Sequence, residues 1–135
     1  MVINDNGNTG TGGGMNQNIG TVNVDITAVN DAPVNTVPGT QTIVEDIQTA
    51  ISGISISDVD AASDNLTTRL QVSNGTLNVT LSGSATISPG TNDTADLTIQ
   101  GSVTDINTTL ASLRYTGDLN ATNADTLTVT TNDPG

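Results

Sequence analysis

Residues 74–81 read Asn-Gly-Thr-Leu-Asn-Val-Thr-Leu. Leu77, Val79 and Leu81 alternate with polar residues, and alternation with a period of two places apolar side chains on one face of a β-strand. The Asn-Gly pair that opens the stretch favours the tight turn of a β-hairpin. This stretch therefore predicts antiparallel β-structure with one face packed on a core.

The same alternation recurs along the chain, in short runs that are rich in β-branched residues and separated by Gly, Asn, Asp and Pro. Short strands at this spacing are typical of an antiparallel sandwich, and we expect about seven of them. The further runs carry apolar pairs or triplets at Val22, Val24 and Ile26, at Ile54 and Ile56, at Leu97 and Ile99, and at Leu127 and Val129.

One segment departs from the strand period. Val103, Ile106, Leu110 and Leu113 are spaced by three or four residues, which is the spacing of one face of a helix. Thr104 or Asp105 would serve as its N-cap. We expect a short helix near 104–111 that crosses between the sheets.

The composition leaves a thin core and a large negative charge. Hydrophobic residues make up 33% of the 135 residues, and Tyr115 is the only aromatic residue. Fourteen acids face only Arg69 and Arg114, so the formal net charge is −12. Nucleic-acid binding requires a basic surface and is excluded as a function. Bound cations would offset the repulsion and add to the free energy of folding.

Catalysis, membrane insertion and disulfide formation find little support. The chain has no His and no Cys, so Ser-His and Cys-His nucleophiles and disulfides are absent. No apolar run approaches the roughly 20 residues of a membrane-spanning helix. We therefore expect a protein that is not an enzyme and does not insert into membranes.

Acidic residues gather at the predicted turns. Ca²⁺ takes six to eight oxygen ligands, and loops at one end of a sandwich can supply them. Acids in turns are also commonly solvated or form Asx turns, so both roles remain open on this evidence. The candidate ligands are Asn30, Asp31, Glu45, Asp58, Asp60, Asp133 and Asp5.

The two ends of the chain resemble each other, which suggests a tandem repeat. Val-Ile-Asn-Asp-Asn-Gly at 2–7 parallels Thr-Thr-Asn-Asp-Pro-Gly at 130–135. On this basis residues 1–28 are the final strands of a preceding or donated repeat, 29–33 a linker, and 34–135 a repeat that lacks its own last strand. Strand 20–28 would then belong to a longer array or would complete the sheet of a neighbouring molecule.

The order of these motifs resembles cadherin-like tandem repeats of large bacterial surface adhesins. Asn-Asp-Ala-Pro at 30–33 matches the linker, Glu45 the acid of the first strand region, Asp58 and Asp60 the Asp-x-Asp motif, and 131–135 the turn before the final strand. The resemblance covers nearly the whole chain. It implies a seven-stranded Greek-key sandwich of the cadherin or immunoglobulin type.

The resemblance also implies a function. Ca²⁺ would bind at a junction through Asn30, Asp31, Asp58, Asp60 and Asp133, with Glu45 acting at the opposite pole. The chain would be a structural or adhesive repeat on the extracellular surface of a bacterium, with neighbouring copies as its partners. The alternatives are a filament subunit that donates strand 20–28 head to tail, and a module that binds glycans or cells.

Overall fold

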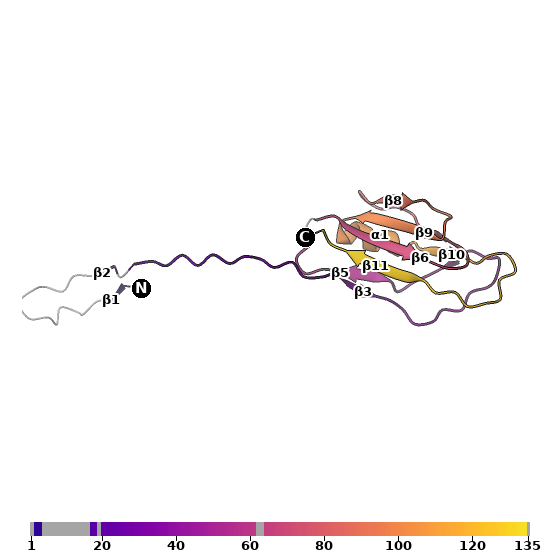
Figure 1. Cartoon of the computed structure of the whole chain (residues 1–135), viewed down its shortest axis with the longest axis horizontal. Coiled ribbons are helices and arrows are strands. Elements are labelled where there is room, and N and C mark those ends of the chain that lie inside the picture. The colour runs from indigo at the N-terminus through magenta and orange to yellow at the C-terminus, as the bar shows by residue number, and fades with distance from the viewer. Residues whose placement is uncertain (1, 4–16, 19, 62–63, 135) are drawn as a thin grey trace, which may run out of the picture.

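The computed structural model describes residues 2–3, 17–18, 20–61 and 64–134. Its body is an elongated β-sandwich that begins at residue 34, and residues 20–33 leave one end of it as an extended segment (Figure 1). A two-stranded ladder of β1 (Val2–Ile3) and β2 (Gln17–Asn18) precedes this segment. The predicted all-β class is confirmed.

The larger sheet has four antiparallel strands in the order β11-β6-β9-β8. Its strands span β6 (Leu66–Gln71), β8 (Thr86–Gly90), β9 (Asp96–Gly101) and β11 (Thr128–Asn132). Alternate residues of β6 are buried, as the period of two requires, and this set includes Thr68 as well as the leucines at 66 and 70.

The opposite layer is built from two smaller ladders. One has the order β4-β10-β7, formed by β4 (Thr49–Ala50), β10 (Arg114–Thr116) and β7 (Thr76–Asn78). The other pairs β3 (Val34–Thr36) with β5 (Ser55–Ser57). Nine strands thus form the described part of the body, rather than the seven expected, because the short strands are interrupted by turns.

The core between the layers is aliphatic. Its largest fully buried apolar side chains are leucines and isoleucines, and Tyr115, the one aromatic, is 8% exposed. Because β9 lies in one sheet and β10 in the other, the chain between them crosses the core, and the helix lies there. The fully buried apolar set is Leu66, Leu70, Leu77, Leu97, Ile99, Ile106, Leu110 and Leu113.

The predicted helix is confirmed as α1 (Val103–Leu110), and Ile106 and Leu110 are buried as expected. Its N-cap is Ser102 rather than Thr104 or Asp105, since the Ser102 side chain accepts a hydrogen bond from the Asp105 backbone N–H. The cap therefore lies two or three residues earlier than the spacing suggested. Within the described residues, no helix is long and apolar enough to cross a membrane.

One further expectation is wrong. Asn74-Gly75 does not join a hairpin, because β6 pairs with β9 and β11 whereas β7 pairs with β10. The turn carries the chain from one sheet to the other. Residues 20–28 lie in no sheet of the described chain, and their apolar residues Val22, Val24 and Ile26 are 77–89% exposed; their assignment to a separate unit stays a prediction. Alternation indicates an extended backbone, but a strand also needs a neighbour.

Two asparagine side chains form the backbone hydrogen bonds that a neighbouring strand would otherwise form. Asn107 of α1 donates to Ile56 O (2.9 Å) and accepts from Ile56 N (2.8 Å). Asn92 makes the same pair of bonds with Val79, both at 2.8 Å. Each amide satisfies both polar groups of a buried residue, as a neighbouring strand would. Asn107 thereby holds β5 against the helix.

Candidate cation site

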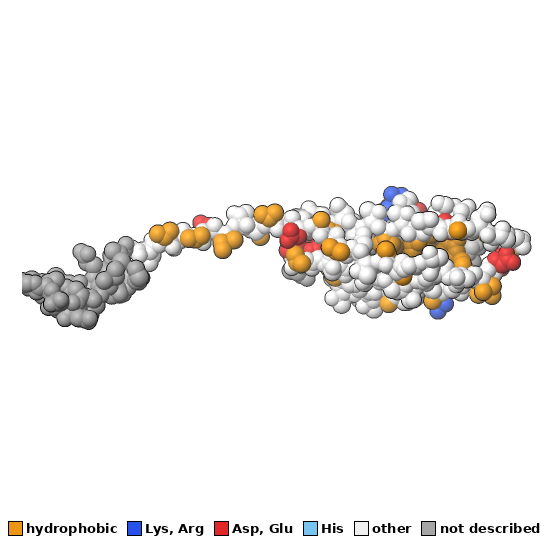
Figure 2. Space-filling view, turned by 90° about the horizontal axis from the view of Figure 1, so that it is seen from below, with side chains coloured by type: hydrophobic (Ala, Val, Ile, Leu, Met, Phe, Trp, Pro, Cys, Tyr) orange, Lys and Arg blue, Asp and Glu red, His pale blue; other side chains and the backbone are white. Residues whose placement is uncertain are grey.

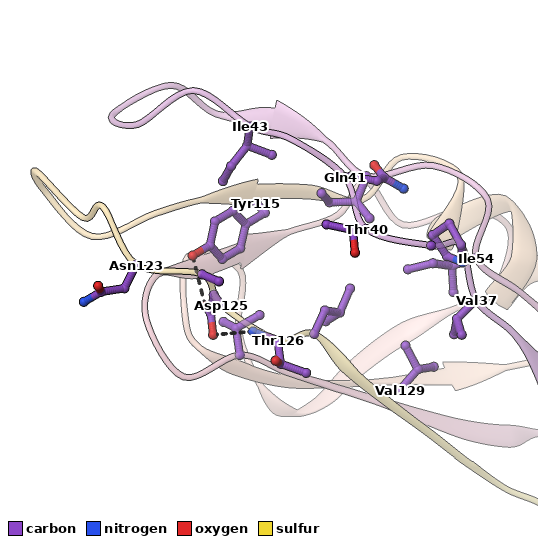
Figure 3. A pocket seen from close by; sticks show the side chains of 16 residues that line it. Val37, Thr40, Gln41, Ile43, Ile54, Tyr115, Asn123, Asp125, Thr126 and Val129 are labelled. Atoms are coloured by element: carbon purple, nitrogen blue, oxygen red, sulfur yellow. Dashed lines mark hydrogen bonds between the residues drawn. The ribbon is translucent and has the colours of Figure 1, made fainter.

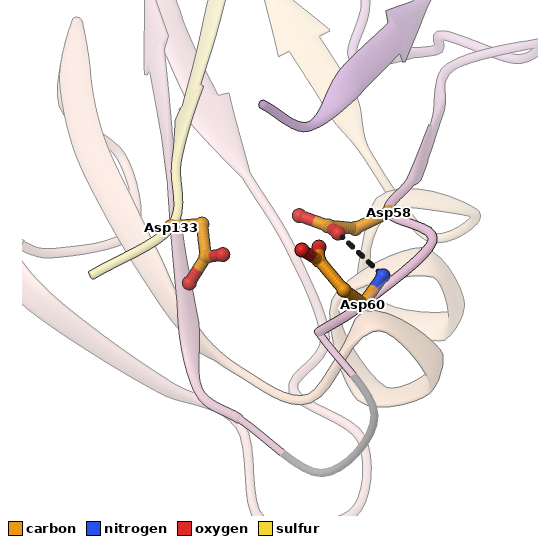
Figure 4. Close-up of side chains that lie close together, drawn as sticks. All are labelled: Asp58, Asp60 and Asp133. Atoms are coloured by element: carbon orange, nitrogen blue, oxygen red, sulfur yellow. Dashed lines mark hydrogen bonds between the residues drawn. The ribbon is translucent and has the colours of Figure 1, made fainter. Parts of the chain in front are cut away.

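The candidate site lies at the end of the sandwich where the extended segment enters. Two parts of the chain meet there: the turn after β5 and the residue after β11. Asp58, Asp60 and Asp133 each offer a carboxylate oxygen, and these oxygens all lie within 4.8 Å of one another. Figure 4 shows the three side chains facing one another across the gap between the two elements.

Local hydrogen bonds fix the turn that carries two of these acids. Asp58 Oδ1 accepts from the backbone N–H groups of Asp60 and Ala61, both at 3.2 Å. This is the Asx-turn geometry by which an aspartate closes a turn at the end of a strand. Asp60 Oδ2 accepts from Asp31 N at 2.8 Å, so the entry segment is bound to the same turn.

The remaining oxygens of the turn have no such partner. Asp58 Oδ2 and Asp60 Oδ1 are buried and accept no hydrogen bond from the residues that the structure describes. Burying a carboxylate oxygen without a donor costs free energy, and most buried polar atoms in folded proteins are satisfied. The structure therefore places two electron-rich oxygens, which no described residue satisfies, beside a third carboxylate.

The acids also influence one another's ionisation. Burial and the neighbouring Asp60 carboxyl raise the pKa of Asp58, against the backbone hydrogen bonds that it accepts. The backbone N–H of Asp31 and the Asp58 carboxyl lower the pKa of Asp60. Two carboxylates so close cannot both carry charge without cost. A bound cation would remove that cost, and metal binding and proton binding would compete.

The structure brings together only part of the predicted ligand set. Asp58, Asp60 and Asp133 form the cluster, and Asp31 joins through its backbone N–H. Asn30 is exposed in the adjoining segment. Glu45 lies at the other end of the body, beside Asp46, whose carboxylate accepts from the backbone of the loop at 118–121. Asp5 lies outside the described residues.

A second polar cluster escaped sequence analysis. The Tyr115 hydroxyl lies between Asn74 O and Asp125 Oδ2, 3.0 Å from the latter. The Asp125 carboxylate also accepts from the backbone N–H groups of Ser73 and Asn74 at 3.0 and 2.9 Å. These donors satisfy Asp125 and fix the turn between β6 and β7. Nothing in the local sequence pairs residues 74, 115 and 125.

Comparison with known proteins corrects the expected identity. No curated protein and no solved structure matches the chain significantly. A family model described as the "Protein GAMETE EXPRESSED 2 domain" matches residues 50–134, which is more than half of the chain and runs from the end of β4 through β11.

The predicted membership among cadherin-like repeats of bacterial adhesins is therefore wrong, because the match is to a eukaryotic gamete protein family. The predicted roles as a bacterial surface repeat, a strand-donating filament subunit or an adhesive module are wrong with it. The Asp-x-Asp motif closes a turn at the end of a strand through local hydrogen bonds, which sandwiches of different families can share. This chain belongs to the Protein GAMETE EXPRESSED 2 domain family.

Proposed function

We propose that this domain is a non-catalytic Ca²⁺-binding β-sandwich module, with the ion bound at the end where Asp58, Asp60 and Asp133 converge. The observation that carries the proposal is a pair of buried carboxylate oxygens in a cluster of three acids, Asp58 Oδ2 and Asp60 Oδ1, which lack hydrogen-bond partners among the described residues. A cation would coordinate both oxygens and neutralise the repulsion between the carboxylates.

The donor set favours Ca²⁺ over other metals. Every candidate ligand atom is an oxygen, and the chain has no His or Cys to supply the nitrogen and sulfur ligands that zinc and copper prefer. Mg²⁺ demands a near-ideal octahedral site, whereas Ca²⁺ accepts irregular sets of six to eight oxygens. Carboxylates on a turn and directly after β11 suit the less demanding ion, and the net charge of −12 attracts it.

Three carboxylates on partly exposed turns suggest modest affinity. Extracellular Ca²⁺-binding modules have dissociation constants of roughly 10⁻⁴–10⁻³ M, which suit the Ca²⁺ concentrations outside cells. The proposal therefore extends to an extracellular location. The predicted partner, a neighbouring copy of the chain, remains a prediction that sedimentation with and without Ca²⁺ would check.

The composition supports a role without catalysis. The chain has no His or Cys to act as base or nucleophile at neutral pH. Two other half-buried carboxylates have structural partners: Asp125 accepts from Tyr115 and three backbone N–H groups, and Asp105 accepts from Ser84. Ion binding is the chemistry that these acids suit best.

The test is thermal and urea unfolding of the protein during titration with CaCl₂, alongside MgCl₂. A ligand at about 100 times its Kd stabilises a protein by ~2.7 kcal/mol. We expect Ca²⁺ to raise the free energy of unfolding by this amount in the native protein and in Asp25→Asn, which removes one charge from the exposed segment. Asp58→Asn should lose it, while its stability without Ca²⁺ stays the same or rises because repulsion with Asp60 is relieved.

Calorimetric titration of the same three proteins measures binding directly. No heat and no stabilisation by Ca²⁺ up to about 10 mM in the native protein, ten times the weakest affinity expected of such modules, would refute the proposal. An equal response in Asp58→Asn would show that the ion binds elsewhere.

A further inference from the structure

A groove runs along one side of the sandwich, away from the acid cluster. It has a volume of about 410 Å³, and Figure 3 shows its lining side chains pointing inward from both layers. The floor is aliphatic and partly exposed, so apolar surface of the core faces solvent here. The floor residues are Ile43, Ile51, Val72, Leu127 and Val129, with the buried Ile54 beneath them.

The two walls of the groove are unpaired backbone. Residues 37–43 on one side and 123–127 on the other belong to no strand. Among the hydrogen bonds of the described residues, none uses a backbone N–H or C=O of residues 37–43. On the other wall, the Thr126 N–H bonds only to the adjacent Asp125 side chain. Free backbone donors and acceptors beside an apolar floor are what an added strand requires.

One end of the groove is acidic. Burial, Asp125 and, more weakly, Asp118 raise the pKa of Tyr115, which lines that end. Asp46 is bound to the same loop as Asp118, through Asn120 N at 3.1 Å. Acidic side chains gather at the end of the body far from the extended segment (Figure 2). The groove residues include no Lys or Arg, so this end favours a positively charged occupant.

We propose that this groove binds an extended segment of another protein, with apolar side chains at alternate positions and a Lys or Arg at the end near Asp118. A wall of seven residues at about 3.3 Å each gives room for a segment of about seven residues. Backbone pairing with residues 37–43 would supply affinity, and the aliphatic floor would select the alternating side chains.

A second copy of this chain is a poorer occupant on grounds of charge. Its segment 20–29 has alternating apolar residues but carries Asp25 and no cation. Two proteins of net charge −12 also repel each other. The groove and the cation site use different residues, so either proposal can fail without the other.

Fluorescence polarisation with labelled peptides tests the proposal on the whole chain. The probe alternates Val and Thr between two terminal Lys residues, about nine residues in all. Three comparison peptides replace Lys by Glu, gather the valines into one block, or copy residues 20–29. We expect the basic alternating peptide to bind at least about tenfold more tightly than each comparison peptide.

Two variant pairs locate the binding. Val129→Thr replaces a methyl group of the floor by a hydroxyl and should weaken binding about three- to tenfold. Val103→Thr makes the same change outside the groove, at the start of α1, and should leave binding unchanged. Asp118→Asn should weaken binding and reduce its dependence on salt, whereas Asp25→Asn should change neither.

Four results would overturn the proposal. One is the absence of binding by the basic alternating peptide at about 1 mM, the limit of weak affinity. A second is equal binding by the peptide whose valines are gathered into one block. A third is an equal loss of binding in Val129→Thr and Val103→Thr. In either case the groove would not be the site. Tighter binding of the 20–29 peptide would assign the groove to a second copy of the chain.

Discussion

Replacing Asn107 by Ala tests whether helix α1 holds β5, and with it the acid-bearing turn, in place. The side-chain amide makes hydrogen bonds of 2.9 and 2.8 Å to the C=O and N–H of Ile56, a residue that is 3% exposed. Leaving two such groups unsatisfied costs about 1–3 kcal/mol each, and the better helix propensity of Ala returns about 0.5–0.7 kcal/mol. We expect the free energy of unfolding to fall by about 1–5 kcal/mol.

Asn92→Ala is the matched control. Asn92 makes the same two bonds, at 2.8 Å, to Val79, which is 2% exposed and follows β7. Both variants should therefore lose similar stability. Only Asn107→Ala should also weaken Ca²⁺ binding, by about tenfold, because β5 leads directly into Asp58 and a loosened strand no longer fixes that carboxylate.

Urea unfolding followed by circular dichroism gives the stability of each variant, and calorimetric titration gives its Ca²⁺ affinity. A loss below about 0.5 kcal/mol in Asn107→Ala would refute the view that the amide replaces a neighbouring strand. Equal loss of Ca²⁺ affinity in both variants would show that the effect is global loosening, not the position of the β5 turn.

Three further predictions concern other parts of the chain. In Gly75→Ala the free energy of unfolding, measured in urea, should fall by more than about 2 kcal/mol. The φ angle of Gly75 is +120°, and a new Cβ would lie 2.9 Å from Tyr115 Oη and nearer still to a backbone oxygen. Gly39→Ala is the control and should lose little stability, because open space surrounds that position. Burial raises the pKa of Tyr115 from 10.0 to about 12. The stability that the buried neutral hydroxyl contributes is therefore fully present below pH 10 and is lost as the pH rises through 12. Unfolding and tyrosinate absorbance should change together, and Tyr115→Phe should remove that pH dependence. Burial and Asp60 raise the pKa of Asp58 above its ordinary value of 3.8, so Ca²⁺ must displace a proton there in acid. The Ca²⁺ affinity should fall by up to about tenfold per pH unit below the raised pKa, and calorimetry that shows the same affinity at neutral pH and at pH 3.8 would contradict this.

The elements that the sequence predicts well are those in which one face is buried. Leu97 and Ile99 are fully buried on β9, and Ile106 and Leu110 are buried on α1, as their spacing indicated. The direction of a side chain follows from the local period of the backbone, and the spacing of apolar residues along a short stretch of sequence shows that period. The N-cap was missed because Ser102 lies outside the apolar pattern and only its hydrogen bond to Asp105 identifies it.

Ligand candidates were predictable as residue types but not as a set. Asp58 and Asp60 are close because they share one turn, which a short motif encodes. Asp133 joins them only because β11 pairs in register with β6, so that the end of β11 reaches the start of β6 beside the turn. Glu45 has the same chemistry and lies at the other end, because nothing in a short motif specifies which turns meet.

Strand partners are the least local property of this fold, and they decide what the apolar surfaces can do. Residues 20–28 and 74–81 both alternate, yet the first pairs with no strand in the part of the chain that the structure describes, and the second changes sheets at Gly75. The groove arises from the same cause: residues 37–43 run beside the core without a neighbour that pairs with their backbone. Asn107 and Asn92 show that this chain satisfies buried backbone with side chains where strands are missing. No such amide bonds to the backbone of residues 37–43, so these N–H and C=O groups form hydrogen bonds with solvent or with another protein. The exposed aliphatic floor beside them favours binding of another protein.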